Sequence, residues 1–236
     1  MSSNWDWQVF LQGTGGGRTY LEWLLSAWGW TVAVSAMALA VALFVGALMG
    51  ILRTTPHKGW VLVGNAWTEV FRNIPLLVQI FIWYHVIPSI FLALRSVPSF
   101  WLVVFALGFF TSARVSEQVK AGIQALPQGQ RHAGLAMGLT LAQTYRYVLL
   151  PMAFRIVLPP LTSEAMNIVK NSAVAFAVSV AELTMFAMQA QEETSRGVEI
   201  YIAVTGLYFL SAFAINRVAL LIENCISVPG MIGEHR

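Results

Sequence analysis

Long apolar runs separated by short polar stretches set the pattern of this 236-residue chain. A helix needs about 20 consecutive, mainly apolar residues to cross the hydrocarbon core of a bilayer. The runs that meet this length cover residues 23–52, 61–92, 99 to about 118, 154–190 and 198–222. The pattern predicts an all-α polytopic membrane protein with five transmembrane helices.

Two of these runs are interrupted. The second run carries Glu69 and Arg72 in its first turns, followed by Pro75, so we expect its start to lie at the membrane interface. The fourth run contains Pro159–Pro160, and proline removes a backbone donor and clashes with the preceding helical turn. We therefore expect the fourth run to break there, and again at the polar triplet 170–172.

Composition agrees with a membrane protein. Hydrophobic residues make up 57% of the chain and charged residues 11%, whereas soluble domains carry about 25% charged residues. The net charge of +3 does not indicate a nucleic-acid partner, and a single cysteine, Cys225, allows no internal disulfide. The first 21 residues lack a basic region followed by a short apolar core, so we expect the first span to act as an uncleaved insertion signal.

Lysines and arginines in the loops predict the orientation, because cytoplasmic loops are enriched in both. One side collects Arg53, Lys58, Lys120, Arg131, Arg146, Arg155 and Arg236. The other side collects Arg18, Arg95 and Arg196, with Glu192 and Glu193 beside them. We therefore expect a periplasmic N-terminal segment (1–21), a transmembrane domain (22–223) with a cytoplasmic loop at about 120–151, and a cytoplasmic tail (224–236).

The predicted cytoplasmic loop holds a polar segment punctuated by glycines. Its pattern is His132-Ala133-Gly134, three residues, Gly138, nine residues, Val148, one residue, Leu150-Pro151. This spacing resembles the Glu-Ala-Ala, Gly, Ile-x-Leu-Pro pattern of ABC importer permeases, and Gly129-Gln130 ahead of it matches the polar amino-acid branch. His132 replaces the glutamate of that pattern, and Gly134 replaces its second alanine.

The resemblance implies the type I ABC importer permease fold, with a coupling helix that docks on an ATPase subunit. We expect a short helix, a glycine turn and a second helix, with Ala133, Gly134 and Gly138 allowing close approach to the partner and Pro151 starting the return to the membrane. The chain lacks the Gly-x-x-x-x-Gly-Lys-Ser/Thr phosphate-binding loop. It is therefore expected to have no catalytic or metal-binding residues, and ATP and Mg²⁺ would bind to the partner.

A second sequence motif indicates which branch of the ABC importer permeases the chain resembles. It carries Glu69, Arg72, Asn73, Pro75 and Gln79 in an arrangement that resembles the Glu-x-x-Arg-Asn-x-Pro-Leu-x-x-Gln signature of polar amino-acid permeases. Glu69 and Arg72 are three residues apart and would face each other on a helix. These two residues could form the start of the helix and pack against another subunit, or they could contact the substrate.

Several polar residues inside the spans are candidates for the substrate path: Arg114, Glu117, Glu164, Asn167, Lys170, Asn171 and Ser172. An ionisable group at the bilayer centre costs about 2.5–3.5 kcal/mol on insertion scales, so each needs a reason. Arg114 stands where many relatives have an aromatic residue, and Asn171 where relatives commonly have aspartate. Both differences make the charge of the path more positive. They favour a substrate with an anionic side chain, because a guanidinium binds a carboxylate with two parallel hydrogen bonds.

Bracing roles remain open for these residues. Arg114 could instead pair with Glu117 one turn away, and Lys170 could extend to the interface. Glu164, Asn167 and Asn171 share one helical face, which could line the path or pack against a neighbouring span.

The sequence is identified as a member of the ABC amino-acid permeases, most similar to those for glutamate and aspartate. The resemblance implies an ATPase dimer, a second homologous permease, a periplasmic binding protein and the bacterial inner membrane. A heterodimer of permeases is expected, and a homodimer stays open. The alternatives are a permease for glutamine or histidine, and an ion-coupled secondary transporter, for which no internal repeat is visible. An intramembrane enzyme is disfavoured because the motifs of such enzymes are missing.

Overall fold

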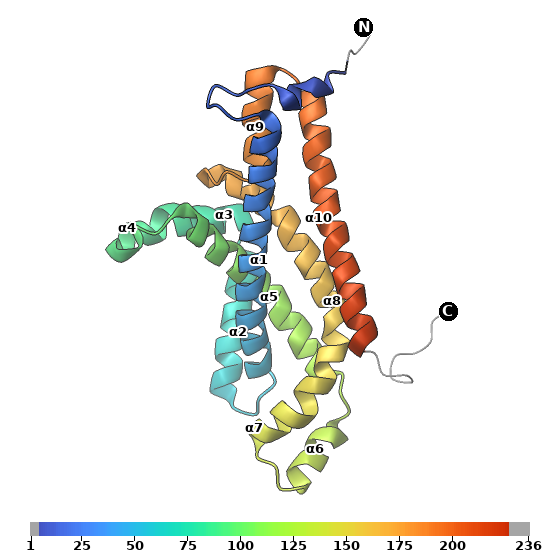
Figure 1. The fold of residues 1–236 in the computed structure, drawn as a ribbon. Helices are drawn as coiled ribbons and strands as arrows, with labels where there is room; N and C mark the ends of the chain where they lie inside the picture. The colour runs from blue at the N-terminus through green and yellow to red at the C-terminus, as the bar shows by residue number, and fades with distance from the viewer. Residues whose placement is uncertain (1–4, 227–236) are drawn as a thin grey trace. The chain divides into compact units, whose positions relative to one another are not determined.

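The computed structural model describes residues 5–226, and all the regular elements in that range are helical (Figure 1). The α-helices are α1 (Tyr20–Leu52), α2 (Lys58–Asn73), α3 (Leu76–Phe81), α4 (Ile87–Ile90), α5 (Ser99–Gln124), α6 (Gln128–Ala136), α7 (Leu141–Thr144), α8 (Leu150–Asn171), α9 (Leu183–Thr194) and α10 (Gly197–Ile226). Short 3₁₀-helices are η1 (Trp7–Leu11), η3 (Leu92–Leu94) and η5 (Ser172–Val178), and single π-turns are η2 (Ile82–Val86) and η4 (Tyr145–Leu149). Most of the predicted tail, residues 227–236, lies outside the described residues.

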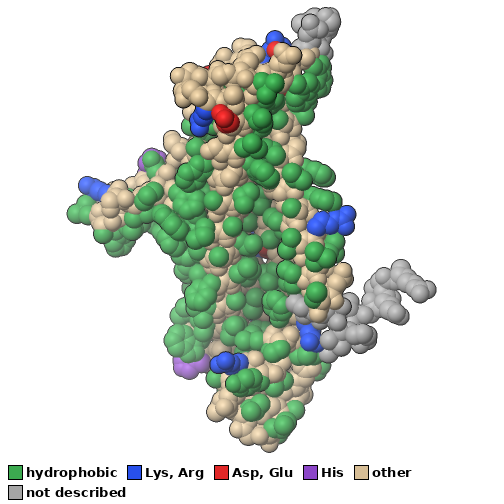
Figure 2. Space-filling model, in the orientation of Figure 1, with side chains coloured by type: hydrophobic (Ala, Val, Ile, Leu, Met, Phe, Trp, Pro, Cys, Tyr) green, Lys and Arg blue, Asp and Glu red, His purple; other side chains and the backbone are tan. Residues whose placement is uncertain are grey.

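Four helical stretches are long and apolar enough to cross a membrane: Tyr20–Leu52, Ser99–Gln124, Leu141–Val178 and Gly197–Cys225. The pair Lys58–Asn73 and Leu76–Ile90 makes a fifth if it is counted as one span, bent by 103°. The bend falls at Pro75, which disfavours helical conformation in the residue before it. Figure 2 shows hydrophobic side chains over much of the visible length of α1 and α10, as expected for helices that face lipid.

The fourth span differs from its prediction in two ways. Helix α8 runs without interruption through Pro159–Pro160, so the expected break there is wrong. Prolines are tolerated in transmembrane helices, where neighbouring groups satisfy the freed backbone acceptors. The second predicted break, at residues 170–172, is confirmed: the α-helix ends at Asn171, and η5 closes at Ser179, whose φ of 59° is left-handed. The span also begins earlier than predicted, at Leu141, and residues 183–194 form a separate helix.

The chain folds as two compact units. The first comprises residues 5–40, 74–108 and 167–213. Its core joins the N-terminal segment to α1, α9 and α10 through Val9, Phe10, Tyr20, Leu24, Ala27, Leu183, Phe186, Ala187, Ala190, Ile200 and Val204. Within this unit, the main-chain N–H of Asp6 donates to Glu199 at 2.9 Å, and the Tyr20 hydroxyl donates to Glu193 at 2.7 Å. The predicted periplasmic segment is therefore packed onto the helices of this unit.

A buried carboxylate starts α9. The Glu182 side chain accepts hydrogen bonds from the backbone N–H groups of Thr184 and Met185, which satisfies two donors at the helix N-terminus. The Tyr208 hydroxyl also donates to Glu182, at 2.7 Å. Burial raises the pKa of the Glu182 carboxyl, although these hydrogen bonds act in the opposite direction. Glu182 therefore fixes α9 against α10.

The second unit comprises residues 41–73, 109–166 and 214–226 and holds the predicted coupling loop. Helices α1 and α5 approach each other closely here at Gly46 and Gly50. A Cβ added to Gly46 would lie 2.5 Å from Val115, and one added to Gly50 would lie 2.7 Å from Val119. This Gly-x-x-x-Gly spacing is a common helix-packing device in membranes, and it was missed in reading the sequence.

Candidate functional site

The predicted coupling loop has the expected form of helix, glycine turn and helix. Helix α6 is followed by Gly138, whose φ of 82° favours glycine, and α7 begins three residues later. Thr140 and Gln143 form a capping box: the Thr140 hydroxyl accepts from the Gln143 N–H, and the Gln143 side chain accepts from the Thr140 N–H at 2.8 Å. The Thr-x-x-Gln spacing would have predicted this helix start.

The small residues of the loop serve different purposes. Gly134 is buried, and a Cβ there would lie 2.8 Å from the Thr144 side chain. Gly134 therefore allows α6 to approach α7 inside the loop, which corrects its expected contact with a partner. Gly129 and Gly138 face open space. The neighbouring Met137 is 82% exposed, so this turn carries an exposed apolar side chain.

The other residues of the loop pattern lie on α6 and at the start of α8. His132 and Ala133 are exposed on α6, and Gln130 is half-buried. Leu150 and Pro151 begin α8, where a helix tolerates proline. The loop is also tied to the α1–α2 turn, because the Tyr145 hydroxyl donates to the carbonyl of Thr54 at 2.7 Å.

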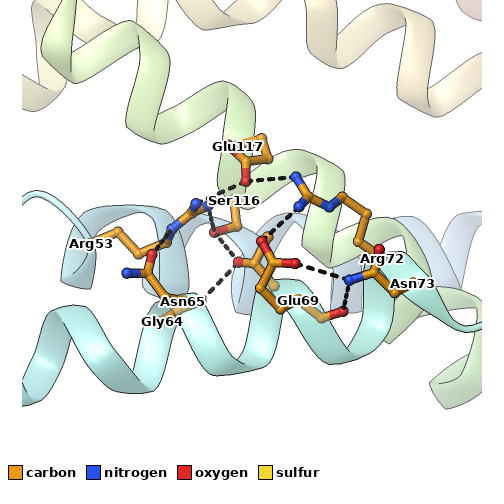
Figure 3. Close-up of polar contacts among 9 residues, drawn as sticks. Arg53, Gly64, Asn65, Glu69, Arg72, Asn73, Ser116 and Glu117 are labelled. Atoms are coloured by element: carbon orange, nitrogen blue, oxygen red, sulfur yellow. Dashed lines mark hydrogen bonds and ion pairs between the residues drawn. The ribbon is translucent and has the colours of Figure 1, made fainter.

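A network of charged residues joins the end of α1 to α2 and α5 (Figure 3). Its centre is Arg53, whose side chain is 5% exposed. Arg53 donates to Glu117 at 2.8 Å, to Asn65 at 2.8 Å and to Ser116 at 3.1 Å. Helix α2 passes so close that a Cβ added to Gly64 would lie 2.5 Å from the Arg53 side chain. The sequence suggested only a loop cation here, because these partners come from distant segments.

The signature residues of α2 complete this network. Arg72 donates to Glu69 at 2.6 Å, which confirms the predicted local pair, and it also lies 3.4 Å from Glu117. The Asn73 amide donates to the Glu69 carboxylate at 2.9 Å and to its backbone carbonyl at 2.8 Å, which closes the last turn of α2. In the first unit, Gln79 donates to the carbonyl of Ile74 at 2.9 Å.

We expect Arg53→Ala to destabilise the protein by about 3 kcal/mol, near the low end for breaking a buried ion pair, because Glu117 is 37% exposed. Arg72→Ala is the matched control. Its side chain is half-exposed, so its loss should cost under about 1 kcal/mol. Thermal denaturation of the purified variants in detergent compares the two. Equal melting temperatures for Arg53→Ala and the parent would contradict a stabilising role for this network.

A second charged cluster lies between α5 and α8. Arg114 is 3.5 Å from Glu164, and the Gln118 amide donates to the other oxygen of Glu164 at 3.0 Å. The Glu164 side chain is 9% exposed, whereas Arg114 is 39% exposed and also lies over the ring of Phe110. The alternative pairing of Arg114 with Glu117 is wrong, because the Glu117 carboxylate is held by two other arginines.

The remaining path candidates lie at the end of α8. Asn167 and Asn171 are half-buried and Lys170 is exposed. Within residues 5–226 the side chains of these three residues form no hydrogen bond with the protein, so they are available to other groups. The Ser172 hydroxyl, by contrast, is buried and donates to the carbonyl of Val169 at 2.7 Å.

Residues 42–227 match the family model of the binding-protein-dependent transport system inner membrane component. The chain belongs to this family. This importer permease is 43% identical, over 99% of both chains, to the glutamate/aspartate import permease protein GltJ of Escherichia coli K12. It is 34% identical to the probable glutamine ABC transporter permease protein GlnM of Bacillus subtilis, over 76% of this chain and 82% of that one.

Solved structures agree with this family. A crystal structure of an amino-acid ABC transporter with histidines superposes with a TM-score of 0.76 at 30% identity, covering 87% of the importer permease and 95% of that chain. A methionine ABC transporter in an inward-facing conformation gives the same TM-score at 20% identity and supports the fold alone. Membership confirms the predicted permease fold and the inner-membrane location. It also confirms that ATP binding belongs to a partner subunit, so an ion-coupled secondary transporter is no longer an alternative.

Proposed function

We propose that this permease imports glutamate and aspartate, which a binding protein delivers to it. The observation that carries the proposal is the pair of opposite charges on α5 and α8, in a chain 43% identical to a glutamate/aspartate permease. The Glu164 carboxylate offers a partner for the ammonium group of an amino acid. The exposed guanidinium of Arg114 adds a partner for an acidic side chain.

The polar residues at the end of α8 stay candidates for the substrate path. Asn167, Lys170 and Asn171 offer unused donors, and Asn171 brings no negative charge that would repel an anionic substrate. Ser172 stays a candidate through its position beside them. The contacts of Glu117 favour a bracing role over the predicted lining role, since both of its arginine partners are held by further residues of α2 or α5.

Uptake by the purified transporter in liposomes tests the substrate. With binding protein outside and ATP inside, we expect labelled glutamate and aspartate to accumulate, and excess glutamine, histidine or arginine to compete weakly. The expected selectivity arises because a neutral or cationic substrate has no side-chain carboxylate for Arg114 to bind. Uptake of arginine or histidine in preference to glutamate would overturn the proposal.

We further propose that residues 128–144 dock on the ATPase dimer and that a second, homologous permease completes the membrane part. The exposed Met137 and the exposed face of α6 supply the docking surface. Closure of the ATPase dimer would then move this loop and shift the permease between its two openings. Transport would be a population shift between two conformations, without covalent chemistry in this chain.

The excess of lysine and arginine in one set of loops supports a periplasmic N-terminus and a cytoplasmic C-terminus. Cys225 allows a direct test, because it is the single cysteine of the chain and is exposed. A membrane-impermeant maleimide should label Cys225 only after the cells are permeabilised. As control, Gly15→Cys in a Cys225→Ser background should be labelled in intact cells. Labelling of Cys225 in intact cells would reverse the orientation.

A further inference from the structure

A cavity of about 340 Å³ lies in the first unit, beside α4 and the start of α5. It is lined by Tyr84, Pro88, Leu94, Arg95, Val97, Ser99 and Leu102. None of these residues belongs to the coupling loop or to the two charged clusters, so the transport mechanism leaves the cavity without a role. Cavities of this volume hold small ligands or the polar part of larger ones.

Arg95 gives the cavity its charge. Its Nε donates to the carbonyl of Pro88 at 3.2 Å, which fixes the guanidinium at the wall. The other two arginines of this unit are engaged: Arg18 stacks on an aromatic ring at 4.8 Å, and Arg196 lies 3.7 Å from a carboxylate. Arg95 has no such partner within residues 5–226. Its two terminal nitrogens are therefore available to an anion.

The rest of the lining distinguishes between anions. Tyr84 and Ser99 carry hydroxyls, which bind phosphate oxygens as readily as carboxylates. Among the described residues that line the cavity none is acidic, so the ammonium group of an amino acid would find no charged partner among them. A phosphodiester needs no such partner. The lining therefore favours a phosphate group over the transported substrate.

Apolar side chains continue from the cavity toward lipid. Ile90 is the last residue of α4, and Phe91 and Leu92 follow it toward the cavity residue Leu94; all three are largely exposed. The candidate span of α5 begins at Ser99, so the cavity lies at the boundary where headgroups meet hydrocarbon. In Figure 2 a blue patch of Lys or Arg atoms lies beside hydrophobic side chains at the end of the segment that Figure 1 labels α4. A ligand with both a phosphate and acyl chains could bind the polar cavity and the exposed apolar side chains at the same time.

We propose that this cavity binds an anionic phospholipid of the phosphatidylglycerol type. Arg95, Tyr84 and Ser99 hold the phosphate, and Ile90, Phe91 and Leu92 contact an acyl chain. Phosphatidylethanolamine binds more weakly, because the lining offers no carboxylate to its ammonium group. The site fixes the α4–α5 connection at the membrane boundary and takes no part in selecting the substrate.

Native mass spectrometry of the whole transporter complex tests this site, with phosphatidylglycerol, phosphatidylethanolamine or glycerol 3-phosphate added in separate arms. The parent should retain phosphatidylglycerol, and Arg95→Gln should weaken retention by roughly tenfold, the effect of losing one charge-assisted hydrogen bond. Val97→Trp keeps the arginine but fills the cavity, and it should weaken retention similarly. Arg18→Gln is the matched control and should leave retention unchanged.

Three results would overturn the proposal. Equal retention of phosphatidylglycerol by the parent, Arg95→Gln and Val97→Trp would mean that the cavity does not bind lipid. Displacement of the lipid by an equal concentration of glycerol 3-phosphate would assign the site to a water-soluble phosphate. Equal retention of phosphatidylethanolamine would remove the assignment of an anionic headgroup.

Discussion

Gly138→Arg should abolish substrate uptake and the stimulation of ATP hydrolysis by loaded binding protein, while the protein still inserts in the membrane. Gly138 turns the chain between α6 and α7 with a φ of 82° and faces open space. A long, charged side chain at this point would stand in the surface proposed to dock on the ATPase. Uptake and ATPase assays on the reconstituted complex measure both effects.

Two further variants separate blocked docking from backbone strain at this turn. Gly138→Asn introduces only a short side chain, and asparagine tolerates positive φ, so this variant should keep most of the activity. Met137→Arg places the long charge on an 82% exposed neighbour without positive φ, so it should fail as Gly138→Arg does. Normal stimulated ATP hydrolysis in Met137→Arg would contradict docking at this turn. Failure of Gly138→Asn together with an active Met137→Arg would assign the effect to strain.

The local order of this loop could be predicted because it is encoded in short spacings. The apolar runs predicted the spans for the same reason, since crossing a bilayer imposes a minimum length on each helix. The predicted glycine turn at Gly138 likewise depends on residues only a few positions apart, and the capping box at Thr140, which was not predicted, is encoded just as locally. Such features need no knowledge of the tertiary fold.

Several features that the sequence did not predict depend on packing between separate helices. Arg53 appeared to be an ordinary loop cation, yet its partners come from helices that begin later in the chain, and its burial follows from their packing. Gly134 appeared to face a partner, but Thr144 covers it. The Pro159–Pro160 pair suggested a break because the rule for proline describes an isolated helix, whereas packing in a membrane protein keeps α8 continuous.

Changing Arg114 should show whether it selects the substrate. We expect Arg114→Ala to reduce glutamate uptake by roughly 10- to 100-fold, the effect of losing one or two hydrogen bonds to a charged group. Stimulation of the ATPase by loaded binding protein should fall much less, since the coupling loop is unchanged. Arg114→Lys keeps the positive charge but cannot form two parallel hydrogen bonds, so its glutamate uptake should lie between that of the parent and that of Arg114→Ala. Uptake of labelled glutamate across a range of concentrations measures these differences.

The control for Arg114 concerns its partner, because Arg114→Ala leaves the buried Glu164 without a cation. The double variant Arg114→Ala/Glu164→Gln removes both charges and restores a neutral contact with Gln118. If Arg114 only braces the helices, the double variant should recover the lost stability and take up as much glutamate as the single variant Glu164→Gln. If Arg114 binds the acidic substrate, the double variant should recover stability but take up less glutamate than Glu164→Gln. Unchanged glutamate uptake in the single variant would leave Arg114 with a bracing role, and the acidic preference would then need another source in the transporter.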